Sequence, residues 1–209
     1  MESTQQRLLK NAERLMAENG ITATSVREIT DAAEANVASV NYYFGSKTEL
    51  LFELLTSRFV QLDTALHAKI KSIEPETGQN TPSVADLGGA YFDTLIEQAF
   101  DSETGRMHPF VSLIQRASSE QEAVLDRAQD LSLPGISMLI DLLADSIALS
   151  ERKKLNFPIL LDMMFGVTIT AISVRSNETR NPVLISAVRG FLVAGAERYM
   201  SCIAIDKSE

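Results

Sequence analysis

Apolar residues recur at spacings of three and four along most of the chain, and long alternations of apolar and polar residues are absent. Spacings of three and four are typical of amphipathic helices, whereas alternation is typical of strands. The pattern therefore predicts an all-α fold. We expect about nine helices. The second begins at residue 25 and the third at residue 37, and the other seven cover residues 4–19, 46–72, 83–100, 109–118, 121–149, 158–175 and 182–202.

Polar residues stand where several of these helices are expected to begin. Residues 25–28 and 46–49 each read S-x-x-E, the pattern of a capping box, and Asn36 can cap the third helix. Gly20 follows the first helix as a left-handed stop. The Pro, Gly, Asn and Thr residues of 74–82 predict a loop.

The last two helices are apolar on nearly every side. Residues 157–174 include one charge, Asp162, and residues 183–197 include only Arg189 and Glu197. A helix with two apolar faces must bury both, either at the centre of one core or against a second copy of the chain. We favour a homodimer formed through the last two helices, since isologous dimers are the commonest assemblies. Small residues there would permit close approach: Ala187, Gly190, Ala194 and Gly195.

The third helix holds an unusual aromatic run. The chain has 9 Phe, 4 Tyr and no Trp, yet Tyr42, Tyr43 and Phe44 are consecutive. A helix advances by about 100° per residue, and this spacing predicts an inward face made of Val37, Val40 and Phe44. The opposite side then shows Ala38, Ser39 and Tyr42, with Asn41 and Tyr43 on the flanks.

A short helix with such a polar outer face, preceded by another helix across a tight turn, has the geometry of a helix-turn-helix. Its slim side at Ala38 and Ser39 could enter a major groove about 12 Å wide. Asn41 can bond bidentately to adenine, Ala38 can touch a thymine methyl group, and the hydroxyls of Tyr42 and Tyr43 can donate to phosphate. Lys47, at the start of the next helix, can also meet a phosphate.

Basic residues elsewhere give weaker support. Arg7, Lys10 and Arg14 form one stripe on the first helix, and Arg27 lies in the first turn of the second. For the stripe alone, a solvated surface is the simpler interpretation. The net charge of −9 argues against bulk attraction to nucleic acid, so any such contact must be local.

The residues from 24 to 51, TSVREITDAAEANVASVNYYFGSKTELL, resemble the DNA-binding signature of the TetR family of bacterial transcriptional regulators. The resemblance implies a homodimeric regulator, usually a repressor, that binds a palindromic double-stranded DNA operator and releases it when a small molecule binds. It implies a DNA-binding domain over residues 1–50 and a helical ligand-binding and dimerisation domain over 51–209. The DNA contacts it implies are Ser25, Arg27, Val37, Ala38, Ser39, Asn41, Tyr42, Tyr43 and Lys47.

The segment departs from the family pattern at three positions. Glu34 and Ala35 stand where a turn Gly and Val are usual, which bears on the geometry of the turn. Asn41 stands where Tyr is common, which suggests a particular operator preference.

In such a regulator the effector lies among the middle helices. Few charged residues interrupt these segments, so we expect an apolar effector with one polar end, and Arg116 or His108 as possible partners for a carboxylate. For His108, which precedes a helix in the sequence MHP, an ordinary loop or cap role is the favoured interpretation. Gly88 and Gly89 mark either a kink, room for a ligand or a later helix start. Candidate lining residues, most of them expected to be core, are Tyr91, Phe92, Ile96, Phe100, Phe110, Val111, Ile114, Met138, Met163 and Phe165.

Other classes of function find little support. The sequence contains no nucleophile elbow, no zinc-protease motif and no phosphate loop, and two histidines with one cysteine make no compact catalytic or metal-binding set. We therefore expect no enzyme activity, cofactor or metal. The polar N-terminus and short apolar runs predict a cytoplasmic protein without membrane spans. A helical dimeric adaptor or binding protein without DNA binding, with the aromatic run as packing, is the alternative.

Overall fold

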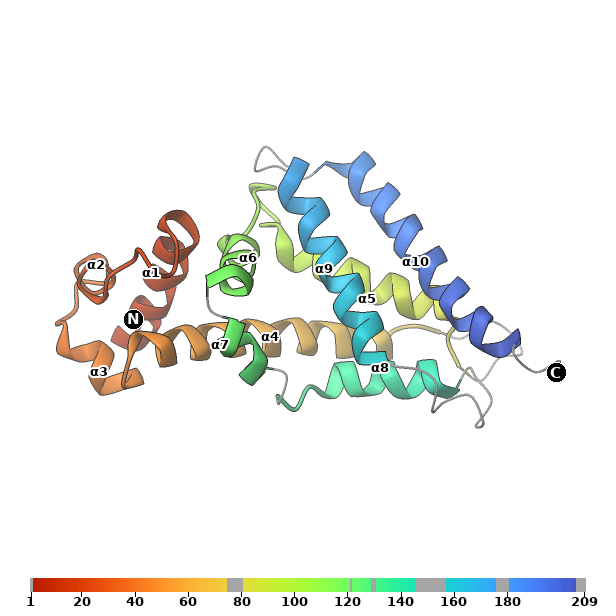
Figure 1. The fold of residues 1–209 in the computed structure, drawn as a ribbon, viewed down its shortest axis with the longest axis horizontal. Helices are drawn as coiled ribbons and strands as arrows, with labels where there is room; N and C mark the ends of the chain where they lie inside the picture. The colour runs from red at the N-terminus through yellow and green to blue at the C-terminus, as the bar shows by residue number, and fades with distance from the viewer. Residues whose placement is uncertain are drawn as a thin grey trace. The chain divides into compact units, whose positions relative to one another are not determined.

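The computed structural model describes residues 2–74, 81–120, 122–128, 131–145, 157–175 and 181–205, and within them the fold is all-α, as predicted (Figure 1). An isolated bridge between Phe100 and Met107 is the one extended pairing recorded among them. The described helices are α1 (Thr4–Asn19), α2 (Val26–Ala32), α3 (Ala38–Phe44), α4 (Lys47–Lys71), α5 (Val84–Ala99), α6 (Pro109–Glu120), α7 (Glu122–Ala128), α8 (Pro134–Asp145), α9 (Phe157–Arg175) and α10 (Pro182–Ile205).

The expectation of one helix over 121–149 is wrong, because two helices, α7 and α8, occupy this stretch. Pro134 is the first residue of α8. Proline suits the first turn of a helix but disfavours helical geometry at the residue before it, here Leu133. The periodic apolar pattern continues across this break, which is why periodicity alone predicted one helix.

The chain divides into two compact units, each built from two stretches of sequence. Unit 1 is made of Met1–Gln61 and His108–Ser132, and unit 2 of Leu62–Met107 and Leu133–Glu209. Helix α4 contributes its first part to unit 1 and its last part to unit 2. The domain boundary at residue 50 stays a prediction.

The helix caps of unit 1 follow the sequence in most places. The predicted capping box of α2 is confirmed, since Glu28 N donates to Ser25 Oγ (3.2 Å) and Ser25 N donates to Glu28 Oε2 (2.7 Å). Only half of the box predicted at Ser46 is recorded: Glu49 N donates to Ser46 Oγ (3.1 Å). The Glu49 carboxylate instead accepts two bonds from Arg127 of α7.

Apolar side chains of α1 form the centre of unit 1. Leu8, Ala12 and Met16 are fully buried, and their spacing of four places them on one side of the helix. Helix α6 packs against α1 and contributes Val111 and Leu113 to the core. The interpretation of residues 4–19 as an amphipathic helix is therefore confirmed.

In unit 2, α10 packs along α5 and α9 (Figure 1). Gly88 and Gly89 lie inside α5 and are buried, so the helix neither starts after them nor breaks there. A Cβ on Gly88 would be 4.0 Å from Ala196 Cβ, whereas one on Gly89 would be 2.4 Å from Arg189 Nη2. The second glycine therefore makes room for the Arg189 guanidinium, which pairs with Asp93 (2.9 Å).

A buried carboxylate fixes the start of α8 within unit 2. Asp63 of α4 is 6% exposed and accepts from the backbone N–H groups of Gly135 (3.0 Å) and Ile136 (2.8 Å). These are among the N–H groups that a helix leaves unpaired at its N-terminus. A Cβ on Gly135 would be 2.4 Å from the Asp63 backbone oxygen, so the close approach of α4 and α8 requires glycine there.

Candidate nucleic-acid interface

Helices α2 and α3 are joined by a tight, hydrogen-bonded turn. Ala35 N donates to Thr30 O (2.9 Å) and Glu34 N to Asp31 O (3.2 Å). Glu34 has φ = 50°, the left-handed conformation that glycine adopts without steric cost. The turn geometry of a helix-turn-helix is thus kept although Glu replaces the usual Gly. Asn36 Oδ1 accepts from Ala38 N (2.8 Å), which confirms its role at the start of α3.

The two sides of α3 differ in exposure as the period predicted. Val40 and Phe44 are buried, whereas Tyr42 is 82% exposed and Tyr43 41%. Ala38 and Asn41 are exposed and Ser39 is half-buried. The rings of Tyr42 and Tyr43 meet edge to face with centroids 4.9 Å apart. The aromatic run is therefore divided between core and surface.

The inward placement of Val37 is wrong, since its side chain is 48% exposed. Val37 lies at the N-terminal end of α3 with helical dihedrals (φ −53°, ψ −36°), so its side chain keeps the helical direction, and its exposure means that this end of the inward face is left uncovered by the described residues. This exposure is compatible with the DNA contact that the family resemblance implies for Val37. That contact stays a prediction.

Lys47 is tied to the loop between α1 and α2. Its Nζ donates to Thr24 O (2.6 Å) and Thr22 O (3.4 Å). Burial lowers the pKa of the Lys47 ammonium, although the charges of Glu120 and Glu28 oppose this shift. The ammonium is thus bonded to two backbone carbonyls, and a phosphate would have to share or replace them.

The predicted DNA contacts of α2 and the basic residues of α1 are placed differently. Ser25 caps α2, and Arg27 is exposed with its Nε 3.8 Å from Asp31 Oδ2. The stripe on α1 does not act as one surface, because Arg7 Nε donates to Ala33 O (3.0 Å) and so holds the end of α2. Arg14 pairs with Glu18 one turn along α1 (3.1 Å).

Two residues of α6 support this region, although the sequence suggested another role for Arg116 and none for Glu120. Arg116 donates from Nε to Ala17 O (2.9 Å) and from Nη2 to Glu18 O (3.0 Å), the free carbonyls at the end of α1. Glu120 Oε2 accepts from Thr22 N (2.8 Å), a bond that lowers the pKa of the Glu120 carboxyl. Their partners are backbone atoms about a hundred positions away, so no local pattern could have indicated them.

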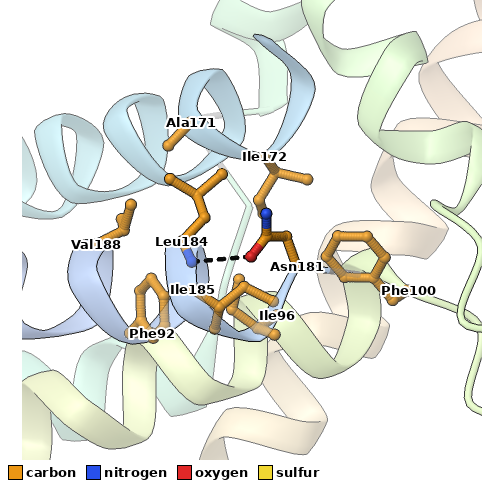
Figure 2. A pocket seen from close by; sticks show the side chains of 9 residues that line it. All are labelled: Phe92, Ile96, Phe100, Ala171, Ile172, Asn181, Leu184, Ile185 and Val188. Carbon is orange, nitrogen blue, oxygen red and sulfur yellow. Dashed lines mark hydrogen bonds between the residues drawn. The ribbon is translucent and has the colours of Figure 1, made fainter. Parts of the chain in front are cut away.

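The residues predicted to line an effector pocket are not all brought together. Phe92 and Ile96 of α5 and Phe100, the residue after it, line a cavity in unit 2 (Figure 2). Residues of α9 and α10 complete the lining. Tyr91, next to them in sequence, is buried and donates its hydroxyl to Leu161 O (3.3 Å). The cavity volume is about 10 Å³, enough for about one water molecule.

The remaining predicted lining residues lie elsewhere. Phe110, Val111 and Ile114 are buried in unit 1, where the Phe110 ring meets that of Phe59 at 5.9 Å. In unit 2, Met138 and Phe165 are half-buried and Met163 is 63% exposed. The predicted carboxylate partners Arg116 and His108 belong to unit 1 as well.

Asn181 supplies a polar edge to the cavity and was not among the predicted lining residues. Its Oδ1 accepts from Leu184 N (3.2 Å), the bond drawn in Figure 2, and from Val183 N (3.1 Å). Asn followed by Pro182 at a helix start is a readable cap signal. The amide nitrogen of Asn181 remains as a donor at the mouth of an otherwise apolar space.

Comparison with known proteins identifies the N-terminal segment. Residues 8–54 match the family described as bacterial regulatory proteins, tetR family. This segment of the chain belongs to the TetR family. The chain is also 31% identical over 77 residues to "Probable HTH-type transcriptional regulator YttP" of Bacillus subtilis (strain 168). That match spans 37% of this chain and 37% of YttP, so it covers only part of each protein.

Solved structures of bacterial regulators share the fold of this chain over nearly its whole length. The fatty acid degradation regulator FadR from Bacillus halodurans is similar with a TM-score of 0.66 and 14% identity, over 93% of this chain and 97% of that one. The TetR family transcriptional regulator PfmR from Thermus thermophilus is similar with a TM-score of 0.56 and 18% identity, over 97% and 100%. At these identities the likeness concerns the fold alone.

Metal-binding and membrane-spanning features are not found in the described part of this chain. Its described residues contain no group of three or more His, Cys, Asp or Glu side chains that could hold a metal ion. Among the same residues, no helix combines the length and apolar character needed to cross a bilayer.

Proposed function

We propose that this TetR-family chain is a transcriptional repressor that binds a palindromic DNA operator as a homodimer and releases it when an apolar effector binds. The observation that carries the proposal is the division of α3. Val40 and Phe44 anchor the helix in unit 1, while Ala38, Asn41 and Tyr42 are exposed on its outer side. A short, anchored helix with a slim polar face is what the major groove accepts.

Each exposed side chain of α3 has a distinct role in this proposal. Asn41 bonds bidentately to an adenine, and Ala38 touches a thymine methyl group beside it. The hydroxyls of Tyr42 and Tyr43 donate to phosphates, and Ser39 and Val37 lie at the edge of the same surface. The roles of Asn41 and Ala38 give sequence preference, whereas the tyrosines set the register of the helix on the duplex.

Cationic and capping residues position the helix on the DNA backbone. Ser25 and Arg27 at the start of α2 and Lys47 at the start of α4 are the proposed phosphate contacts. Lys47 would exchange its bonds to the carbonyls of Thr22 and Thr24 for a phosphate oxygen. Because burial already lowers the pKa of the ammonium, a phosphate would offset part of its desolvation.

The Tyr42→Ala variant gives the sharpest test of DNA binding. A duplex selected from a random pool by the wild-type chain would be titrated by fluorescence anisotropy. We expect Tyr42→Ala to weaken binding by about tenfold, the loss of one charge-assisted hydrogen bond, with unchanged thermal unfolding because the side chain is 82% exposed. Gln98→Ala, an exposed change on α5, should alter neither quantity.

Equal affinity of Tyr42→Ala and wild type would contradict the assigned role of α3. Failure of the selection to enrich any duplex would instead favour the alternative, a helical adaptor without DNA binding. The adaptor hypothesis treats the aromatic run as packing. It predicts loss of stability in Tyr42→Ala, which the exposure of the side chain does not favour.

The proposed dimer interface lies on α9 and α10. Both helices display large apolar side chains on their open sides: Met163 and Val167 on α9, and Val183 and Phe191 on α10. Exposed small residues, Ala187, Gly190, Ala194 and Gly195, lie beside those of α10. Exposed apolar surface of this kind favours a partner, and small residues allow helices to approach closely.

The proposed effector site is the cavity lined by α5, α9 and α10 (Figure 2). Its volume of about 10 Å³ is far below the roughly 300–1,000 Å³ of ligand pockets, so an effector must select a more open arrangement. The apolar lining suits a hydrocarbon chain, and Asn181 offers a donor to its polar end. That FadR, similar in fold, is a fatty acid degradation regulator supports an apolar effector of this kind.

Operator titrations with and without palmitate test the effector proposal. We expect palmitate to weaken operator binding, and Ala171→Phe, which fills the cavity, to remove this response while leaving affinity without palmitate unchanged. Equal operator affinity with and without palmitate would count against a fatty acid effector. An equal palmitate response in Ala171→Phe would place the effector site elsewhere.

A further inference from the structure

Unit 1 contains an open cleft of about 500 Å³ between α1, the first part of α4 and the start of α6. Its volume is within the range of small-molecule sites. Lys10, Glu13 and Arg14 line it from α1, and Ser57, Arg58 and Gln61 line it from α4. The proposed DNA contacts and the proposed effector cavity include none of these six residues.

The Glu13 and Gln61 acceptors at the wall of the cleft are already used within the protein. Glu13 is 6% exposed, and its carboxylate receives Arg58 Nε at 2.8 Å and Arg58 Nη2 at 2.6 Å. Arg58 Nη1 donates to Gln61 Oε1 (3.0 Å) and so occupies that oxygen as well. This bidentate pair neutralises both charges and makes a fixed wall.

The donor groups that line the cleft remain available. Lys10 is exposed, and its ammonium has no recorded partner among the described residues. Arg14 uses Nη1 toward Glu18 (3.1 Å), which leaves its Nε and Nη2 donors. On the opposite wall, the Ser57 hydroxyl and the Gln61 amide nitrogen are likewise unused in the described structure.

These donors are arranged as two facing pairs. Lys10 and Arg14 are four residues apart on α1, and Ser57 and Gln61 are four apart on α4, so each pair lies on one side of its helix with Cβ atoms about 5–6 Å apart. With Glu13 and Arg58 neutralising each other, the remaining charge at the cleft is positive, on a chain whose net charge is −9. The floor includes the apolar residues Leu9 and Leu54.

We propose that this cleft binds a small organic dicarboxylate. One carboxylate pairs with Lys10 and Arg14, the other accepts from Ser57 and Gln61, and the carbon chain between them covers Leu9 and Leu54. Arginine and lysine recognise carboxylates through charge-assisted bonds, and the hydroxyl and amide donors add direction. This site is separate from the proposed effector cavity and does not depend on DNA binding.

Isothermal titration of the full chain with succinate, at constant ionic strength and without DNA, tests the proposal. We expect saturable binding, weakened about tenfold in Lys10→Gln and in Arg14→Gln, as for the loss of one charge-assisted bond. Succinamide, which has the same carbon chain without charge, should not bind. Lys71→Gln removes one exposed positive charge of α4 that does not line the cleft and should leave binding unchanged.

Three results would overturn the proposal. Absence of saturable binding at millimolar succinate would show that the cleft is not a site. Equal weakening by Lys71→Gln would show general charge attraction rather than recognition by Lys10 and Arg14. Binding of inorganic phosphate with the same dependence on Lys10, but not of succinate, would assign the cleft to a different class of anion.

Discussion

At the scale of single residues, Glu34 shows how a family turn tolerates an unusual side chain. Its φ of 50° is left-handed, and an L-residue other than glycine pays about 1–2 kcal/mol for that conformation. The side chain is exposed, so the cost is one of backbone geometry rather than of packing. The turn keeps its shape because Ala35 N and Glu34 N are both bonded back to α2.

Glu34→Gly should therefore stabilise the chain by about 1 kcal/mol, after allowance for the greater freedom of glycine in the unfolded state. Urea unfolding measures the change. Glu34→Ala is the matched control, because alanine keeps the Cβ that makes the conformation costly and should leave stability near that of the wild type. A gain in Glu34→Ala equal to that in Glu34→Gly would show that the carboxylate, not the backbone, was unfavourable.

The ionised carboxylate of Glu120 supports the loop between α1 and α2, because it accepts a hydrogen bond from Thr22 N. The bond from Thr22 N lowers its pKa below the ordinary value of 4.5. Above pH 4.5 the stabilisation from ionised Glu120 is fully present. As the pH falls, the unfolded chain takes up the proton first, and the stabilisation is lost by the time the pH passes the lower pKa of the folded state.

Glu120→Gln should consequently reduce the difference in unfolding free energy between about pH 7 and about pH 3.5. Urea unfolding at the two pH values measures this difference. Glu103→Gln, in the exposed loop before α6, controls for the removal of one carboxyl. If the unfolding free energy of Glu120→Gln changed between the two pH values as much as that of the wild type, the bond to Thr22 would not depend on the charge of the Glu120 carboxylate.

The exposure of the residues on α3 could be predicted because one helical period determines it, and Val40, Phe44 and Tyr42 follow that period. The exposure of Val37 could not be predicted, because the period gives the direction of its side chain but not whether a neighbour covers the end of the helix. The bonds of Lys47 were also beyond prediction. They depend on the loop carbonyls of Thr22 and Thr24, which reach it only through the tertiary packing of unit 1.

At the scale of helices, the two adjacent glycines of α5 have different reasons to be small. Gly88 faces Ala196 and Val193 at ordinary contact distance, so a methyl group would fit. Gly89 lies beneath the Arg189 guanidinium, where a methyl group would displace the side chain from Asp93. From the sequence, both glycines could be predicted to lower the stability of a helix. Which side chain packs against each glycine could not be predicted.

Gly88→Ala should stabilise the chain by up to about 1 kcal/mol through helix propensity. Gly89→Ala gains the same propensity but loses a partly exposed ion pair, worth about 0–1 kcal/mol, and should be about 1 kcal/mol less stable than Gly88→Ala. Thermal unfolding compares the two. In an Arg189→Ala background the two substitutions should become equal, and a persistent gap there would mean that the guanidinium is not the cause.

Helix boundaries were predictable where a local signal exists and not where a distant group decides them. Ser25 and Glu28 lie three residues apart and form their box as expected. The start of α8 depends on Asp63, whose partners Gly135 and Ile136 are more than seventy positions away. Pro134 was the available local signal, because it suits the first turn of α8 and disfavours helical geometry at Leu133.

At the scale of the whole molecule, the open sides of α9 and α10 set the proposed assembly. Phe191 is 71% exposed and Val183 77%, values that are unusual for large apolar side chains on a chain of mixed charge. The sequence alone left open whether these helices form a core or an interface. The structure buries one side of each helix in unit 2 and leaves the other uncovered by the described residues.

Phe191→Glu should convert the proposed dimer to a monomer at micromolar concentration, because two carboxylates would face each other across a two-fold interface. Light scattering after size exclusion measures the mass. Val60→Glu, an equally polar change at an exposed position of α4, should leave the dimer intact. Unchanged mass in Phe191→Glu, or a monomeric wild type, would exclude α10 as the interface.

The hydrogen bonds from α6 to the end of α1 and the loop after it can form only late in the synthesis of the chain on the ribosome. Thr22 and Glu120 are 98 positions apart, and Arg116 is 99 from Ala17. At about 5–20 residues per second, a ribosome needs roughly 3–12 seconds to extend the chain from Gln61 to Glu120. During that interval α1, α2 and α3 have left or are leaving the exit tunnel without α6, and the apolar face of α1 that α6 covers is open to chaperones. Helix α3, which we propose to contact DNA, is therefore translated among the first residues of the chain but obtains its complete support only after more than half of the chain has been made.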